Sequence, residues 1–272
     1  MRWRATALLA LMVVAGVAQA RVMIPREAQP AHAYFEMVRE KKPCKAGAEC
    51  FVEYLVLSNG LIVRKKIDSE KYDAVHPGFD IRRGENSAVA TLFAEVAAWF
   101  AEGPTGGGSY TDPNNLYFYD GTAHQAFSSP EPPPEKFQEI FSTLGKAFEA
   151  ADLAEDFYLH AYFQPLAGST ESFHLFNDGT FIASAFDRNS YKMTGTSIIK
   201  LPADTQDGLR ALVDKARGGT GGGYMRCAAS TGYEYALVEF SMGGKSLKDY
   251  TCGTGDGDFP ATLNAVKAAA AP

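Results

Sequence analysis

The sequence predicts an α+β protein made of two tandem repeats, each of antiparallel hairpins with two helices packed on the sheet. Residues 59–72 align without a gap on residues 178–191, and residues 101–108 align on residues 216–223. The two matches follow the same order at nearly the same separation, which is typical of a duplicated unit. Hairpin signals between apolar runs then favour antiparallel sheets. We place the repeats at residues 21–152 and 153–272.

The first twenty residues have the features of a secretory signal peptide. Arg2 and Arg4 precede an apolar run at residues 5–17, and residues 18–20 form an A-x-A cleavage site. We therefore expect a mature chain that starts at Arg21 and is periplasmic or secreted, without membrane insertion after cleavage. An uncleaved membrane anchor is the alternative, but the run is shorter than the roughly 20 residues that a spanning helix needs.

Composition limits the classes of partner. Hydrophobic residues make up 46% of the chain, which is enough for a packed core. The net charge is −6, whereas nucleic acids and anionic membranes require a basic surface. We therefore expect no nucleic-acid partner.

Four cysteines follow the signal segment, and an even number in an exported chain predicts two disulfides. Three pairings are open. We favour Cys44–Cys50 and Cys227–Cys252, because each pair then lies within one repeat. The spacings differ from those of zinc ribbons and C-x-x-C redox motifs, so no metal is expected at these cysteines.

Both repeats should follow the order strand, hairpin, helix, hairpin, helix. In the first repeat the expected segments are a strand at 33–40, a hairpin of 50–57 and 61–67, a helix at 87–101 capped by Asn86 or Ser87, a hairpin of 116–119 and 122–127, and a helix after residue 134. In the second they are a strand at 157–164, a hairpin of 172–176 and 180–186, a helix opened by Pro202 and Asp204, a strand at 224–229, a hairpin of 233–241 and 245–252, and a helix near Asp258.

The turn at Asn59-Gly60 predicts which residues share a face. Asn-Gly between apolar runs is typical of a two-residue type I′ turn. Pairing across it, and across the matching turn at residues 177–179, predicts one apolar core face in each repeat. Its expected members are Tyr54, Val56, Val63 and Ile67 in the first repeat, and Phe173, Leu175, Ile182 and Phe186 in the second.

No motif in the chain predicts a catalytic centre, a metal site or a cofactor. The glycine runs at 106–108 and 221–223 lack the Gly-Lys-Ser/Thr ending of a phosphate loop. Ser197 and Lys200 match S-x-x-K, but the neighbouring β-branched residues favour a strand, on which the two side chains would not meet. Residues 253–258 lack the spacing and closing glutamate of a calcium loop.

His160 and His174 form the one pair that we expect to meet, directly opposite each other on two paired strands. Opposed histidines can bind a metal or transfer protons near neutral pH. Aromatic residues surround them and define a candidate ligand-contact face, whose members are Tyr158, His160, Tyr162, His174 and Phe176. Packing of one repeat on the other is the alternative use of this face.

These observations favour an exported, disulfide-stabilised protein-binding module, such as an inhibitor or neutraliser of another protein. Two alternatives stay open. One is a hydrolase that uses His160 and His174 with an unidentified acidic partner. The other is a glycan-binding envelope protein that uses Tyr158 and Tyr162.

Overall fold

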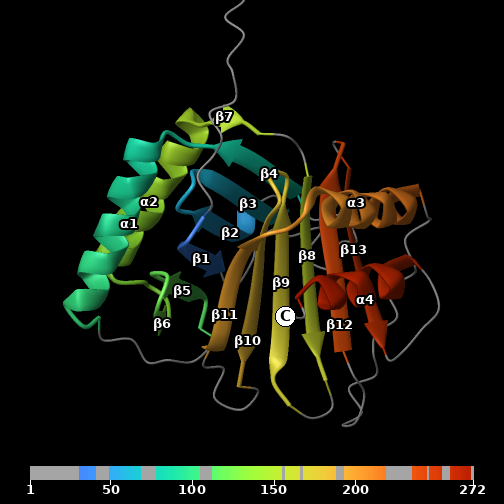
Figure 1. Ribbon diagram of the computed structural model, residues 1–272. Helices are drawn as coiled ribbons and strands as arrows, with labels where there is room; N and C mark the ends of the chain where they lie inside the picture. The colour runs from blue at the N-terminus through green and yellow to red at the C-terminus, as the bar shows by residue number, and fades with distance from the viewer. Residues whose placement is uncertain are drawn as a thin grey trace, which may run out of the picture.

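The computed structural model describes ten stretches of the chain. They are residues 31–40, 49–68, 78–104, 112–154, 157–165, 168–187, 193–218, 235–243, 245–252 and 258–270. The predicted signal peptide, both glycine runs and the strand expected at 224–229 lie outside them. In these residues the chain forms two antiparallel sheets and four helices (Figure 1). The α+β class is therefore confirmed.

The first half of the chain alternates strands and helices in the predicted order. Its elements are β1 (Tyr34–Glu40), β2 (Glu49–Leu57), β3 (Leu61–Asp68), β4 (Gly78–Arg83), α1 (Asn86–Ala101), β5 (Asn114–Tyr119), β6 (His124–Ser129), α2 (Glu135–Ala150) and β7 (Asp152–Leu153). The second half contains β8 (Phe157–Gln164), β9 (Thr170–Phe176), β10 (Thr180–Phe186), β11 (Met193–Lys200), α3 (Ala203–Gly218), β12 (Tyr235–Met242), β13 (Lys245–Cys252) and α4 (Asp258–Ala270). Sequence analysis missed β4 and β7, and it anticipated β11 only as an extended stretch around Ser197 and Lys200.

The two sheets have corresponding strand orders. The first runs β6-β5-β1-β2-β3-β4-β7, and the second, read in the same sense, runs β13-β12-β8-β9-β10-β11. The first strand of each half thus lies third in its sheet and pairs with both the second and the fifth strand of that half. The two-residue β7 is an addition that pairs with β4.

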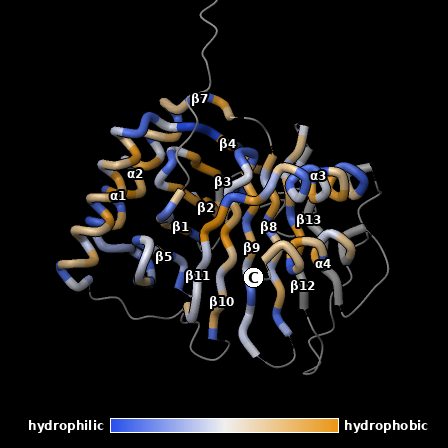
Figure 2. Tube along the Cα trace, viewed as in Figure 1, coloured by the Kyte–Doolittle hydropathy of each residue, from blue (hydrophilic) through white to orange (hydrophobic). Residues whose placement is uncertain are grey.

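The helices lie on the two outer flanks, and both sheets lie between them (Figure 1). Apolar side chains of α1 and α2 share one hydrophobic cluster with β1, β2 and β3, and those of α3 and α4 share another with β8, β9 and β12. A third cluster joins the inner faces of the two sheets. Figure 2 shows the hydrophobic character of α1 and of the central strands β2 and β3. Both faces of these strands are therefore buried.

The two aligned turns, at residues 58–60 and 177–179, have three residues each, which corrects the predicted faces. Gly60 N–H donates to Leu57 O at 3.0 Å, and Gly60 has a φ of 93°. This is the geometry of a type I turn closed by a left-handed residue, rather than the type I′ turn expected at Asn59-Gly60. Val56 consequently pairs with Ile62.

This one-residue difference moves half of the expected core face to the other side of the sheet. Tyr54, Val56, Phe173 and Leu175 do face the helices. Val63 and Ile182 instead belong to the cluster between the sheets. The prediction allowed only one buried face for each hairpin. In the structure, one face of each sheet packs on the helices and the other face packs on the opposite sheet. The side chain of Ile67 lies outside the described part of the chain.

Gly60 gives a test of this turn. A Cβ at Gly60 would lie 3.0 Å from the backbone oxygen of Gly84, in a left-handed conformation that other residues adopt at a cost. We expect Gly60→Ala to lower the free energy of unfolding by about 1–3 kcal/mol. Gly208→Ala, at an exposed position of α3 with open space around the new Cβ, should instead raise it by about 0.5–1 kcal/mol. Urea unfolding of the two variants measures both effects, and equal effects would contradict the turn geometry.

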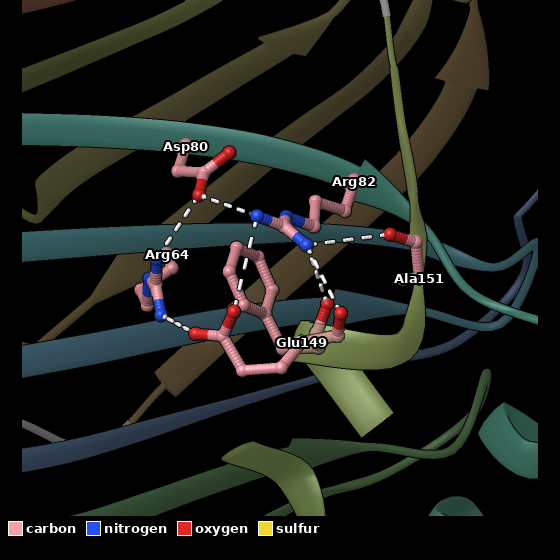
Figure 3. A network of polar contacts seen from close by, with 6 residues as sticks. Arg64, Asp80, Arg82, Glu149 and Ala151 are labelled. Carbon is pink, nitrogen blue, oxygen red and sulfur yellow. Dashed lines mark hydrogen bonds and ion pairs between the residues drawn. The ribbon is translucent and has the colours of Figure 1, made fainter. Parts of the chain in front are cut away.

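The C-terminal end of α2 is tied to the first sheet by two arginines (Figure 3). Arg82 donates to the carbonyl oxygens of Glu149 and Ala151 at 3.2 and 3.4 Å, so a cation occupies the negative end of the helix dipole. Arg64 pairs with Asp80 at 3.0 Å and with Glu149. Both guanidinium groups lie over the ring of Phe148. This network fixes α2 on the sheet.

The ends of the helices are close to the predicted ones. α1 begins at Asn86, and neither Asn86 nor Ser87 is its cap, because Glu85 holds that position without a side-chain hydrogen bond. α3 begins directly after Pro202, and α4 begins at Asp258. The boundary between the repeats at residue 152 stays a prediction, and β7, which spans it, pairs with the first sheet.

Candidate functional site

The inner faces of the two sheets enclose a seam, defined here as the space lined by Tyr34, Glu36, Glu53, Lys65, Tyr158, His160, Ser172, His174 and Glu239. Its apolar part is made of residues from both sheets. They are Ala31, Tyr34, Leu55, Leu57, Leu61, Val63, Ile81, Tyr158, Phe176 and Ile182. The seam brings the candidate site residues together with charged residues that the sequence did not single out.

The candidate ligand-contact face lies in this seam. Tyr158, Phe176 and His174 are only 2%, 1% and 7% exposed, while His160 and Tyr162 are half-buried. Phe79 of the first sheet lies 5.2 Å from the ring of Tyr158. At Tyr158 and Phe176, this face is therefore covered by the first half of the chain. This is the alternative use of the face that sequence analysis left open.

The predicted pairing of the two histidines is confirmed. His160 and His174 are direct partners on β8 and β9. Their rings are parallel, with an interplanar angle of 3° and centroids 4.5 Å apart. Ser172 lies between the two imidazoles, and Glu239 lies beside His160. Glu239 is an acidic neighbour that sequence analysis had not identified.

Four hydrogen bonds join this group into one chain across β9, β8 and β12. Tyr158 OH lies 2.9 Å from Nδ1 of His174, and Nε2 of His174 lies 3.2 Å from Oγ of Ser172. The same Oγ lies 3.1 Å from Nε2 of His160. Nδ1 of His160 then lies 2.8 Å from Oε1 of Glu239. Every side chain that takes part in these four hydrogen bonds belongs to the second sheet.

Lys65 connects this chain to the first sheet. Its Nζ donates to Oε1 of Glu239 at 2.7 Å and lies 3.8 Å from Oε2 of Glu53. The side chain of Glu239 is only 1% exposed. Burial alone would raise the pKa of Glu239, but Lys65 and His160 lower it well below its usual range. Glu239 is thus a buried carboxylate held ionised by its two neighbours.

The charge of Glu239 sets the direction of the hydrogen bonds. An ionised carboxylate only accepts, so Nδ1 of His160 donates to Glu239, and an unprotonated Nε2 accepts from Ser172. Burial and the neighbouring His160 lower the pKa of His174 well below its ordinary value, so the imidazole of His174 is neutral. His174 then donates from Nε2 to Ser172 and accepts from Tyr158 at Nδ1. The four hydrogen bonds of the chain then have one consistent direction.

Carboxylates outnumber cations at this end of the seam. Glu36, on the seam face of β1, has its pKa raised to about 8 by burial and by Glu53 and Glu239, against a smaller opposing effect of Lys65. Oε2 of Glu239 is buried and has no hydrogen-bond partner. The seam therefore holds a proton on Glu36 at neutral pH.

A cavity of about 300 Å³ lies beside Tyr158 and Lys65. It is lined by Phe79, Asp80, Ile81, Leu153, Ala154, Ser241 and Ser246. Ser241 is the direct strand partner of Tyr158, so the hydrogen-bond chain ends next to this cavity. Phe79, which lines the cavity, is also the direct strand partner of Lys65, so the cavity lies near Lys65 as well as near Tyr158.

Cys50, the cysteine predicted at the start of β2, is buried and disulfide-bonded. Its partner lies outside the described residues, as do Cys44, Cys227 and the side chain of Cys252, so the pairing stays a prediction. Among the described residues, no three His, Cys, Asp or Glu side chains are arranged to hold a metal ion. None of the described helices has both the length and the apolar composition that a membrane span requires.

The class that these observations define is an α+β protein with two facing antiparallel sheets and a polar seam between them. The chain matches no protein-family model, and no curated protein matches its sequence.

Sequence analysis missed Lys65, Glu239 and Glu36. A signal was present at Glu239, which is the one charged residue of β12, whereas Lys65 lies between two other charged residues of β3. A single charged residue in a strand also fits a sheet with one exposed face.

Proposed function

We propose that this chain is an exported, disulfide-stabilised protein-binding module that inhibits or neutralises another protein. The observation that supports this proposal is the edge strand β11. β11 is the terminal strand of the second sheet and has eight residues. An exposed edge of this length offers backbone groups to which an extended segment of a partner can add. Export is inferred from residues 1–20.

The hydrogen bonds of β11 show which of its backbone groups face outward. Leu201 N–H donates to Gly179 O at 3.0 Å, which fixes the phase of the ladder between β10 and β11. In this phase the N–H groups of Thr196, Ile198 and Lys200 point away from β10. Ile199 is 41% exposed and offers an apolar contact at the same edge. Proline and bulky charged residues, which protect many edge strands, do not interrupt residues 193–199.

Thr196→Pro tests this proposal, because it removes one outward N–H from the middle of β11. Thr196→Ala is the matched control, since it removes the same side chain and keeps the N–H. We expect the mature wild-type chain and Thr196→Ala to capture one stoichiometric protein from an extract of the source organism, read by mass spectrometry. Thr196→Pro should capture it at least tenfold less.

Circular dichroism of all three baits confirms that they are folded. Equal capture by all three would contradict strand addition at β11. An empty capture at high bait concentration would contradict the protein-binding function itself.

We also propose that the two halves are tandem repeats of one unit, which supplies the rigid scaffold. The corresponding strand orders support this proposal. The aligned turns meet each other, with Asn59 Nδ2 donating to Asp178 Oδ2 at 2.8 Å. Contact between equivalent positions is typical of a two-fold arrangement. A pair of equivalent backbone hydrogen bonds also supports the repeat. Gly84 N–H donates to Gly60 O at 2.9 Å in the first half, and Leu201 N–H donates to the aligned Gly179 O in the second.

The glycan-binding alternative relied on Tyr158 and Tyr162 as a surface. Tyr158 lies inside the seam, so these two residues do not form a continuous exposed platform. The hydrolase alternative gains an acidic partner and a hydroxyl group, which are considered next.

A further inference from the structure

Protein binding at β11 leaves the hydrogen-bond chain of the seam without a role. Ser172 is its central member, with an imidazole nitrogen on each side at 3.1 and 3.2 Å. The imidazole of His160 is held in turn by a buried carboxylate at 2.8 Å. Serine, histidine and a carboxylate in this order are the arrangement that activates a serine hydroxyl for attack on a carbonyl.

We propose that Ser172 is a reactive nucleophile, with His160 as its general base and Glu239 as the residue that positions His160. The substrate class is a short-chain, uncharged carboxylic ester. The proposal is independent of partner binding at β11, because the two sites share no residue.

The direction of the hydrogen bonds supports this assignment. Glu239 accepts the Nδ1 proton of His160, which leaves Nε2 as the acceptor for the hydroxyl proton of Ser172. On the other side, Nε2–H of His174 donates to the serine oxygen and stabilises negative charge on it. Lys65 keeps Glu239 charged. The serine proton therefore has an acceptor, and the serine oxygen has a donor.

Burial and charge select the substrate. Ser172 is only 6% exposed, whereas His160 and its neighbour Tyr162 are half-buried, so only a small acyl group can reach the hydroxyl from their side. Two carboxylates, Glu53 and Glu239, lie against one lysine, so a negatively charged acyl group would be repelled.

The reaction has two steps. Ser172 Oγ forms a bond to the ester carbonyl carbon while its proton moves to Nε2 of His160. The carbon–alkoxide bond then breaks, and the alcohol leaves with the proton from His160. Water attacks the acyl-serine with His160 as base, which releases the carboxylic acid and restores Ser172.

A fluorophosphonate probe tests the nucleophile on the mature wild-type chain without any mutation. Attack by Ser172 forms an oxygen–phosphorus bond and releases fluoride. We expect one label per chain, located by mass spectrometry on the peptide that contains Ser172. Ser172→Ala should lose the label and the slow hydrolysis of p-nitrophenyl acetate. Ser184→Ala, which removes another buried hydroxyl of the seam face, should keep both.

Two further variants test the roles of the neighbours. His160→Gln keeps a hydrogen-bonding side chain but cannot take the proton, so labelling should slow at least tenfold. Glu239→Gln should change the dependence of the labelling rate on pH between pH 5 and pH 9, which a purely structural residue would not do. Circular dichroism and unfolding curves verify that each variant is folded.

Three results would overturn the proposal. They are a wild-type chain that is folded and unlabelled at saturating probe, a label on a residue other than Ser172, and a labelling rate unchanged in folded His160→Gln.

Discussion

Replacing Lys65 with methionine is expected to lower the free energy of unfolding by about 3–5 kcal/mol, since it leaves a buried carboxylate without its cation. Glu239 is 1% exposed and depends on the 2.7 Å contact with Lys65. Its depressed pKa stabilises the fold at neutral pH, and this contribution is lost as the pH falls below the ordinary value of 4.5 towards the folded value. Urea unfolding at pH 7 measures the effect.

Two further variants show whether the loss comes from the seam. Lys66→Met changes the next residue of β3, whose side chain points to the opposite face, and should cost about 1 kcal/mol or less. Lys65→Met combined with Glu239→Gln removes both charges and should recover at least half of the loss. A double variant as unstable as Lys65→Met would contradict the role of the buried carboxylate.

Glu36→Gln is expected to stabilise the protein at alkaline pH and to leave it nearly unchanged at pH 5. The folded pKa of Glu36 is raised to about 8 from 4.5, so the folded state holds a proton that the unfolded chain releases. Stability associated with Glu36 is therefore complete below pH 4.5 and is lost as the pH rises towards 8. The loss by pH 9 is on the order of 4–5 kcal/mol. Glutamine at position 36 resembles the protonated acid and does not ionise, so the variant should not lose this stability at alkaline pH.

Unfolding curves of wild type and variant at pH 5, 7 and 9 measure this difference, which should grow with pH. Glu135→Gln, at an exposed position in the first turn of α2, is the control and should change stability by less than about 1 kcal/mol at each pH. A constant difference between Glu36→Gln and wild type across this range would contradict the raised pKa.

Local patterns in the sequence predicted most elements of this fold. The helices α1 and α3 follow from apolar spacing, although the predicted caps of α1 were wrong, and β8 was predicted with its exact bounds. The hairpin register was wrong by one residue, because Gly60 closes a three-residue turn that the Asn-Gly pair alone does not distinguish from a two-residue one. Since side chains alternate, this small error exchanged the faces of Val63 and Ile182.

The seam could be predicted only in part, for a different reason. The pairing of His160 and His174 depends on one hairpin, so it followed from local sequence. Lys65 and Glu239 are 174 positions apart, and their contact depends on how the two sheets face each other. A sequence shows that a charged residue interrupts an apolar strand, but not which distant residue neutralises it.

The chain of hydrogen bonds from Glu239 to Tyr158 has one further consequence. Each link holds a single proton, so one added proton on His160 would turn Nε2 into a donor and make Ser172 donate to His174. His174 would then donate to Tyr158, and the hydroxyl of Tyr158 would have to seek an acceptor toward Ser241 and the cavity. A charge added on His160 thus changes which hydrogen bonds Tyr158 makes, through the positions of hydrogen atoms along the chain.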